Sequence, residues 1–292
     1  MTTSRLPHLA QRLFNRPLAI LPDKAEVVMA ALADRFGVAR LFRADGTIRA
    51  FDGDDDFDLG APAAPKLFAM TAGVAVIPIE GTLVHRLGSV HPYSGMTGYD
   101  GIRALFAAAW EDPDVAAIVL DIDSPGGEVP GCFDLADTIY NARQTGDKPI
   151  WAILNESAYS AAYALASAAS RVVVPRTGGT GSVGVIALHT DLSKALTASG
   201  LTVTIISYGA HKADGIEVRP LSDDALARFQ ADVDATGDLF VETVARNRGL
   251  AVAEVKAQQA LTYLGQAGVA VGLADAVLSP DAAFVELVGT LR

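Results

Sequence analysis

The chain of 292 residues contains one cysteine and five histidines, too few for most disulfide and metal chemistry. Cys132 cannot form an internal disulfide, which is typical of proteins from a reducing compartment. No grouping of cysteine and histidine has the spacing of a zinc site. We therefore expect no structural metal and no cofactor, and a fold that depends on its apolar residues, which make up 50% of the chain.

Positive charge and long hydrophobic runs are also scarce. The chain has 23 basic and 34 acidic residues, and its net charge of −11 disfavours binding to nucleic acid or to anionic lipid. The longest apolar runs, such as VAAIVL at 115–120, are far shorter than the roughly 20 residues that span a bilayer. Prolines and charges interrupt the apolar stretch after Arg16, which makes it a poor apolar region for a secretory signal. We expect a cytoplasmic protein without a membrane span.

Three regions follow one another along the chain. Residues 1–50 hold two short helical patterns, LAQRLF and AEVVMAALADRFG, and are predicted to form a helical extension. Residues 51–66 carry five aspartates followed by alanines and prolines, as expected of an exposed linker. Residues 67–292 are predicted to form the main domain.

Strand-like and helical patterns alternate in the main domain, which predicts an α/β fold. The segments VAAIVLDID and LTVTIIS are almost entirely apolar, as expected of strands covered on both faces. Ser222 is expected to cap a long helix that ends at Gly249.

The segment DIDSPGGEVPG, residues 121–131, leaves one of these strands and enters a helix. Gly126 and Gly127 have no side chain to shield their backbone amides, so these amides could hold an oxyanion. An ordinary strand-to-helix turn would also explain the glycines. TGGTGSVG at 177–184 lacks the lysine of a phosphate-binding loop, which argues against nucleotide binding.

Ser160 lies among small residues in NESAYSAAYALASAAS, at the expected start of a helix. It is a candidate nucleophile, although a helix-capping serine would have the same surroundings. A nucleophilic serine needs a base. His189 ends one strand-like run, and Lys212 follows another in SYGAHKADG. A lysine can act as a base only where an apolar pocket keeps it uncharged, and a surface position is the alternative for Lys212.

Four of these segments together resemble the signal peptide peptidase A family of serine proteases. DSPGG at 123–127 is similar to the oxyanion motif of the family, and AYSAAY to its nucleophile segment. TGSVGVI at 180–186 is similar to the strand that follows, and GAHKADG to the lysine loop. Residues 263–277 resemble the closing segment with its Gly-Leu-x-Asp turn. Many members have two glycines where this chain has Ala161 and Ala162, which suggests a tighter substrate cleft.

The resemblance implies a ClpP/crotonase-type spiral fold of repeated β-β-α units and a serine endopeptidase with a Ser/Lys dyad. Ser160 would be the nucleophile, Lys212 the general base and Ser182 a hydroxyl that orients the lysine. The amides of Gly126 and Gly127 would form the oxyanion hole. The family forms rings, so we expect a homo-oligomer that acts on a polypeptide.

The N-terminal extension and the absence of a membrane anchor resemble the phage-encoded type, which processes scaffold and capsid proteins during head assembly. The implied location is the cytoplasm of a bacterial host or the inside of a phage procapsid. A cytoplasmic signal-peptide-type peptidase is the alternative within the family.

Three other interpretations remain open at the level of sequence. An acyl-CoA enzyme of the same fold could use Glu128 as its acidic group. A ClpP-like triad could pair Ser160 with His189 and an aspartate. A non-enzymatic assembly protein could use the same cleft only for binding.

Overall fold

The computed structural model describes residues 17–22, 24 and 66–291. The helices predicted at LAQRLF and AEVVMAALADRFG, and the predicted linker apart from Lys66, lie outside the described residues. Within residues 1–50, the described part contains a short strand, β1 (Leu18–Ile20), which pairs with the main domain.

A sheet with the strand order β12-β9-β8-β6-β3-β2 forms the centre of the domain. Its strands are β2 (Ala69–Thr71), β3 (Val74–Glu80), β6 (Ala117–Ser124), β8 (Ile150–Ala158), β9 (Arg171–Val174) and β12 (Ala276–Val277). All of its neighbouring strands are parallel except β2, which pairs antiparallel with β3 at the edge. The run VAAIVLDID forms β6, so this predicted buried strand is confirmed.

Two smaller sheets lie at the carboxyl ends of these strands. One has the order β1-β7-β4-β5, and the other pairs β10 with β11. Their strands besides β1 are β4 (Thr82–Val84), β5 (Met96–Gly98), β7 (Gly126–Glu128), β10 (Gly179–Gly181) and β11 (Thr262–Leu264).

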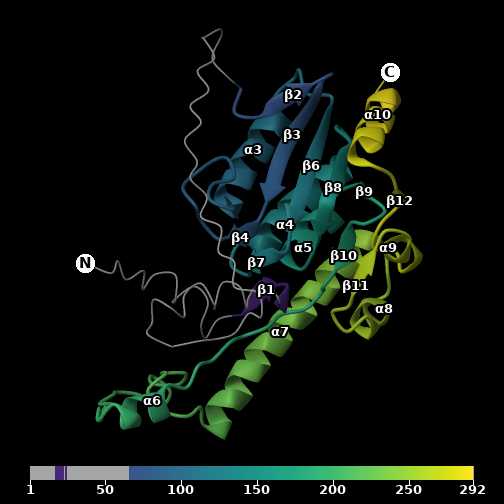
Figure 1. The fold of residues 1–292 in the computed structure, drawn as a ribbon. Helices are drawn as coiled ribbons and strands as arrows, with labels where there is room; N and C mark the ends of the chain where they lie inside the picture. The colour runs from purple at the N-terminus through teal and green to yellow at the C-terminus, as the bar shows by residue number, and fades with distance from the viewer. Residues whose placement is uncertain (1–16, 23, 25–65, 292) are drawn as a thin grey trace, which may run out of the picture.

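Helices cover both faces of the central sheet, as Figure 1 shows. The helices are α3 (Tyr99–Glu111), α4 (Cys132–Thr145), α5 (Ala161–Ser167), α6 (Ser193–Ala198), α7 (Asp223–Arg248), α8 (Val252–Ala257), α9 (Gln266–Ala270) and α10 (Pro280–Thr290). Because side chains alternate along a strand, Ile118 and Leu120 of β6 join the core under α3, α4 and α5, whereas Val119 faces α10. The predicted α/β fold is confirmed.

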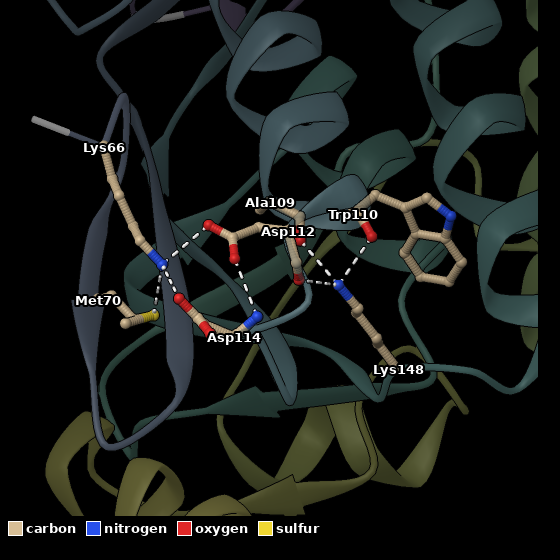
Figure 2. Close-up of polar contacts among 7 residues, drawn as sticks. All are labelled: Lys66, Met70, Ala109, Trp110, Asp112, Asp114 and Lys148. Carbon is tan, nitrogen blue, oxygen red and sulfur yellow. Dashed lines mark hydrogen bonds and ion pairs between the residues drawn. The ribbon is translucent and has the colours of Figure 1, made fainter. Parts of the chain in front are cut away.

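Two lysines hold the C-terminal end of α3 (Figure 2). Lys148 Nζ donates hydrogen bonds to the carbonyl oxygens of Ala109, Trp110 and Asp112, at 3.1, 2.7 and 2.7 Å. These carbonyls include the last ones of the helix, which lack helical partners. Lys66 Nζ lies 2.9 Å from a carboxylate oxygen of Asp112. Together the two lysines fix the turn that leads into β6.

The long helix α7 begins and ends as the sequence predicts. The Ser222 side chain accepts a hydrogen bond from the Ala225 amide, and Gly249 ends the helix in a left-handed conformation. The C-terminal half of α7 packs into the core, where Phe240 makes an edge contact with Phe133.

Residues 187–222 form a projecting arm, which includes α6 and leads to the end of α7 farthest from the central sheet (Figure 1). The prediction that LTVTIIS, residues 201–207, forms a buried strand is wrong for the single chain. This segment has no strand pairing, and the Ile206 side chain is 94% exposed. Its apolar sequence indicates burial, but none of the residues that the structure describes forms a second layer over it.

The chain segment after α9 closes against α5. Arg248 and Asp275 form a two-pronged ion pair with N–O distances of 2.7 and 3.0 Å, and the Val172 amide donates to the same carboxylate at 2.7 Å. Burial disfavours the charged carboxylate, but these hydrogen bonds outweigh it and lower the pKa of Asp275. The buried hydroxyl of Tyr163 donates to the Leu273 carbonyl at 2.7 Å and so ties α5 to this turn.

Candidate active site

The two loops with the predicted site residues leave neighbouring parallel strands at the same edge of the sheet. β6 ends at Ser124 and β8 at Ala158, and these two residues are paired. The Tyr159 amide donates to the Ser124 carbonyl at 3.1 Å, which links the two loops. The carboxyl ends of parallel strands are the usual position of a binding site in such folds.

Ser160 occupies the sharp turn between β8 and α5. Its backbone has φ 54° and ψ −123°, an uncommon conformation for a residue with a side chain. Its amide donates to the Gly181 carbonyl at 2.9 Å, and its Oγ lies 3.5 Å from the Gly184 carbonyl oxygen. Ser160 precedes the first residue of α5, but its side chain accepts no capping hydrogen bond. The capping role therefore does not explain this serine, and its strained backbone is typical of functional positions.

Gly126 lies directly beside Ser160. Its φ is +98°, and a Cβ added there would be 2.9 Å from Ser160 Cβ and would overlap the carbonyl oxygen of Ala19. Both the backbone conformation and the close approach therefore require glycine. The sequence motif correctly indicates a special backbone position here.

The two glycine amides of the predicted oxyanion hole have different partners. The Gly126 amide donates to Ser124 Oγ at 3.2 Å, and this hydroxyl donates to the Gly81 carbonyl at 2.6 Å. Gly127 lies opposite Ala19 in the antiparallel pairing of β7 with β1. Gly127 is therefore better placed than Gly126 to donate to a chain lying where β1 lies. Ser124, which holds this loop, was not predicted as a site residue from the sequence.

Ser182 follows β10 on the other side of Ser160. It is 6% exposed, has φ 54°, and its amide donates to the Leu261 carbonyl at 2.9 Å. Gly181, the residue before it, accepts the hydrogen bond from the Ser160 amide. The structure thus brings the segments of Ser160, Ser182 and Gly126 together.

Lys212 lies elsewhere in the single chain. It is exposed in the projecting arm, close to Asp214, which forms an ion pair with Arg228 near the start of α7. α7 reaches the core only around Phe240, twelve residues further along the helix, or about 18 Å at 1.5 Å per residue. Within one chain the structure does not bring Lys212 to Ser160.

Glu128 and His189, which the alternatives would use, each have other neighbours in the structure. Glu128 accepts a hydrogen bond from the His85 amide at 2.7 Å. His189 lines a different cavity, which lies between residues 185–189 and the first turns of α7.

A cavity of about 610 Å³ adjoins the Ser160 turn and is lined by Glu80, Asp121 and Asp123 as well as by Ser124 and Tyr159. Burial raises the pKa of Asp121; a hydrogen bond with Asn155 opposes this shift, and the neighbouring carboxylates add to it. The cavity is lined by three acidic side chains and one lysine, Lys24, and this acidic lining suits neutral or basic chain segments.

Strand β1 was not predicted from the sequence. Pro17 and Pro22 interrupt an apolar stretch, and the structure places the residues between them against β7. A short apolar run bounded by prolines is the signal that predicts an extended segment.

Two further findings concern the residues that the structure describes. None of their helices combines the length and the apolar character needed to cross a membrane. No group of three or more of their histidine, cysteine and acidic side chains is arranged to hold a metal ion.

Comparison with known proteins gives a consistent family. The profile of peptidase family S49 matches residues 142–288. The head-tail preconnector protein GP5 of Enterobacteria phage P21 is 40% identical over 94% of this chain and 55% of its own length. The capsid assembly protease C of Escherichia phage lambda is 41% identical over 94% of this chain and 63% of its own length. Protease 4 of Haemophilus influenzae is 24% identical over 76% of this chain and 35% of its own length. The chain thus spans a little over half the length of the two phage relatives.

Proposed function

Because this chain belongs to peptidase family S49, we propose that it is a serine endopeptidase in which Ser160 attacks the peptide bond. The observation that carries the proposal is the backbone of Ser160, which is strained, forms no side-chain cap and lies against Gly126. Two successive units support the finer assignment to the ClpP/crotonase-type spiral fold. In each, a long strand of the central sheet (β3, then β6) leads through short strands of the β1-β7-β4-β5 sheet to a helix (α3, then α4).

The proposed reaction has two halves. A neutral lysine amine, that of Lys212, accepts the proton of Ser160 Oγ while this oxygen attacks the carbonyl carbon of the substrate. The Gly127 amide donates to the oxyanion, and Gly126 leaves room for it beside the serine. The protonated amine then gives its proton to the leaving nitrogen as the C–N bond breaks. The neutral amine then takes a proton from water while the water oxygen attacks the acyl-enzyme, and it returns this proton to Ser160 Oγ as the bond between the acyl carbon and Oγ breaks.

The dyad requires a second copy of the chain, because Lys212 is far from Ser160 within one copy. The arm that carries Lys212 exposes large apolar side chains, among them Ile206 at 94% and Tyr208 at 100%. Burying this arm against another copy would cover these side chains and would desolvate the lysine, as a neutral base needs. Ser182, close to Ser160, is the proposed hydroxyl that orients the incoming amine. We therefore propose a ring-forming homo-oligomer.

The substrate that we propose is a scaffold or capsid protein of a phage, cut during head assembly. The proposal rests on the phage relatives, one of which carries the name capsid assembly protease C, and on their 40 to 41% identity to this chain. The protein would then act in the cytoplasm of a bacterial host or inside the procapsid.

Cleavage of casein by the full chain tests the catalytic proposal. Ser160→Ala should abolish cleavage. Ser170→Ala, at an exposed serine beyond the end of α5, removes hydrogen bonds to the Ile150 backbone and should leave cleavage by the folded chain unchanged. Lys212→Ala should abolish cleavage and His189→Ala should not. Equal cleavage by wild type and Ser160→Ala would refute the assignment of the nucleophile, and loss only in His189→Ala would replace the dyad by a triad.

A further inference from the structure

Strand β1 comes from the segment that precedes the main domain, yet both of its edges form backbone hydrogen bonds with segments of the candidate active site. On one edge, Leu18 exchanges two backbone hydrogen bonds with Ile186, at 2.7 and 2.9 Å. On the other edge, the Leu21 amide donates to the Pro125 carbonyl at 3.0 Å. β1 therefore fills the space between the glycine loop and the segment that follows Ser182.

The middle residue of β1 lies at the reacting position proposed above. Hydrogen-bonded positions recur at every second residue of an antiparallel pair, so the next one after Leu21 is Ala19, opposite Gly127. The Ala19 carbonyl oxygen and Ser160 Cβ both lie next to Gly126. A Cβ added to this glycine would be within 3 Å of each of them. The carbonyl of Ala19 is thus between the proposed oxyanion donor and the proposed nucleophile.

The side chains of β1 are enclosed as those of a bound peptide would be. Leu18, Ala19 and Ile20 are at most 5% exposed. The methyl of Ala19 is fully buried and belongs to the main core, which also contains Ala161 and Ala162 at the start of α5. A larger side chain at this position would have to displace its neighbours. Beyond Ile20, the chain continues along the acidic cavity, which Leu21 and Lys24 line.

We propose that residues 18–21 occupy the substrate groove of their own chain and inhibit it by competing with other polypeptides. The proposal rests on the function proposed for Ser160. It also defines the substrate class: an extended segment with a small residue, such as alanine, on the acyl side of the cut bond and apolar residues on both sides of it. Such a segment binds by adding a strand between two existing edges, and its backbone provides most of the hydrogen bonds.

A tethered competitor acts at an effective concentration on the order of millimolar. A free peptide with the sequence of residues 17–22, PLAILP, should therefore bind poorly to a chain whose own β1 is in place. It should bind at least about tenfold more tightly when β1 is excluded.

The test uses the full chain with Ser160→Ala, so that binding is measured without hydrolysis. Ala19→Arg is added to exclude β1, because a guanidinium cannot be buried there without a partner. Ala282→Arg, at an exposed position of α10 on the other side of the sheet, is the matched control. Binding of fluorescein-labelled PLAILP is followed by anisotropy, and the melting temperature checks folding. Leu18→Pro, which removes the amide that donates to Ile186, excludes β1 without adding a charge and replaces Ala19→Arg if that variant does not fold.

Tighter binding of the peptide by the β1 variant than by the Ala282→Arg control supports the proposal. Equal binding by both, or no binding by either, overturns it. In chains that retain Ser160, the β1 variant should also cleave casein with a lower KM than wild type. If no chain cleaves casein but the binding difference is present, the catalytic proposal fails and the groove assignment stands. If wild type cleaves casein but the β1 variant shows neither tighter peptide binding nor a lower KM, the groove assignment fails and the catalytic proposal stands.

Discussion

Substitution of Gly126 by alanine should disable the site in two ways: it should strain the backbone at residue 126, and it should displace Ser160 and the chain that lies where Ala19 lies. A residue with a side chain at the φ of +98° that Gly126 adopts costs roughly 1 to 2 kcal/mol. The new methyl would also lie 2.9 Å from Ser160 Cβ, would overlap the Ala19 oxygen, and would meet any substrate carbonyl that takes the place of Ala19. Restoring ordinary contact distances requires movements of roughly 0.5 to 1 Å.

Displacements of this size at a reacting centre reduce the rate by about 10²-fold. We therefore expect Gly126→Ala to lower kcat/KM for a fluorogenic protein substrate by about that factor. Gly146 provides a matched control, because it also has a positive φ, +74°, but a Cβ there has no neighbour within 4 Å. Gly146→Ala should lower the free energy of unfolding by about 1 to 2 kcal/mol and leave kcat/KM unchanged. Wild-type kcat/KM in Gly126→Ala would refute the close approach on which the site is built.

Three further predictions concern groups around the site. Asp275→Ala should lower the free energy of unfolding by about 2 kcal/mol at pH 7, because Arg248 is left buried without its partner. In urea titrations this loss should shrink as the pH falls below about 4 and through the lowered pKa of Asp275, and a loss that is the same at every pH would contradict the ion pair. Asp121→Asn should raise the free energy of unfolding at pH 7, because burial raises the pKa of this carboxyl and disfavours its charged form. At pH 3 the carboxyl is protonated in the folded and the unfolded chain, so the substitution should have no such effect. A lower free energy of unfolding at pH 7 would contradict this. Cys132 should not react with Ellman's reagent at pH 8 until the chain unfolds, because burial raises the pKa of its thiol to about 12. Fast labelling of the native chain would show that the core behind Ser160 is open.

Much of the fold could be predicted because its signals are local. The alternation of apolar runs with helical patterns predicts the α/β domain, and β6 forms where VAAIVLDID predicts it. The ends of α7 follow from the capping serine at 222 and the glycine at 249. In each case the residues that determine the element lie within it or next to it.

The prediction of a buried strand for LTVTIIS failed because the burial of a segment depends on which other parts of the protein pack against it. The same apolar composition that forms β6 inside the sheet leaves residues 201–207 exposed in the projecting arm. Sequence indicates that such a segment needs a partner, but not whether the partner is the same chain. The position of Lys212 depends on the same distinction, since this lysine follows the segment directly.

The strand β1 was missed for a different reason. Leu18–Ile20 is only three residues long, and its pairing partners, β7 and Ile186, lie more than a hundred residues away. Ser160 could be selected from its small neighbours, but its backbone strain and its contact with Gly126 depend on loops that only the folded sheet brings together.

Mixing two inactive variants tests the central claim, that Ser160 of one copy works with Lys212 of another. Full-length Ser160→Ala and Lys212→Ala chains are each expected to leave casein uncut. After unfolding and refolding together in equal amounts, about a quarter of the contacts between neighbouring copies should combine an intact serine with an intact lysine. We expect recovery of about that fraction of wild-type activity. Folded mixed oligomers with no recovered cleavage would contradict it.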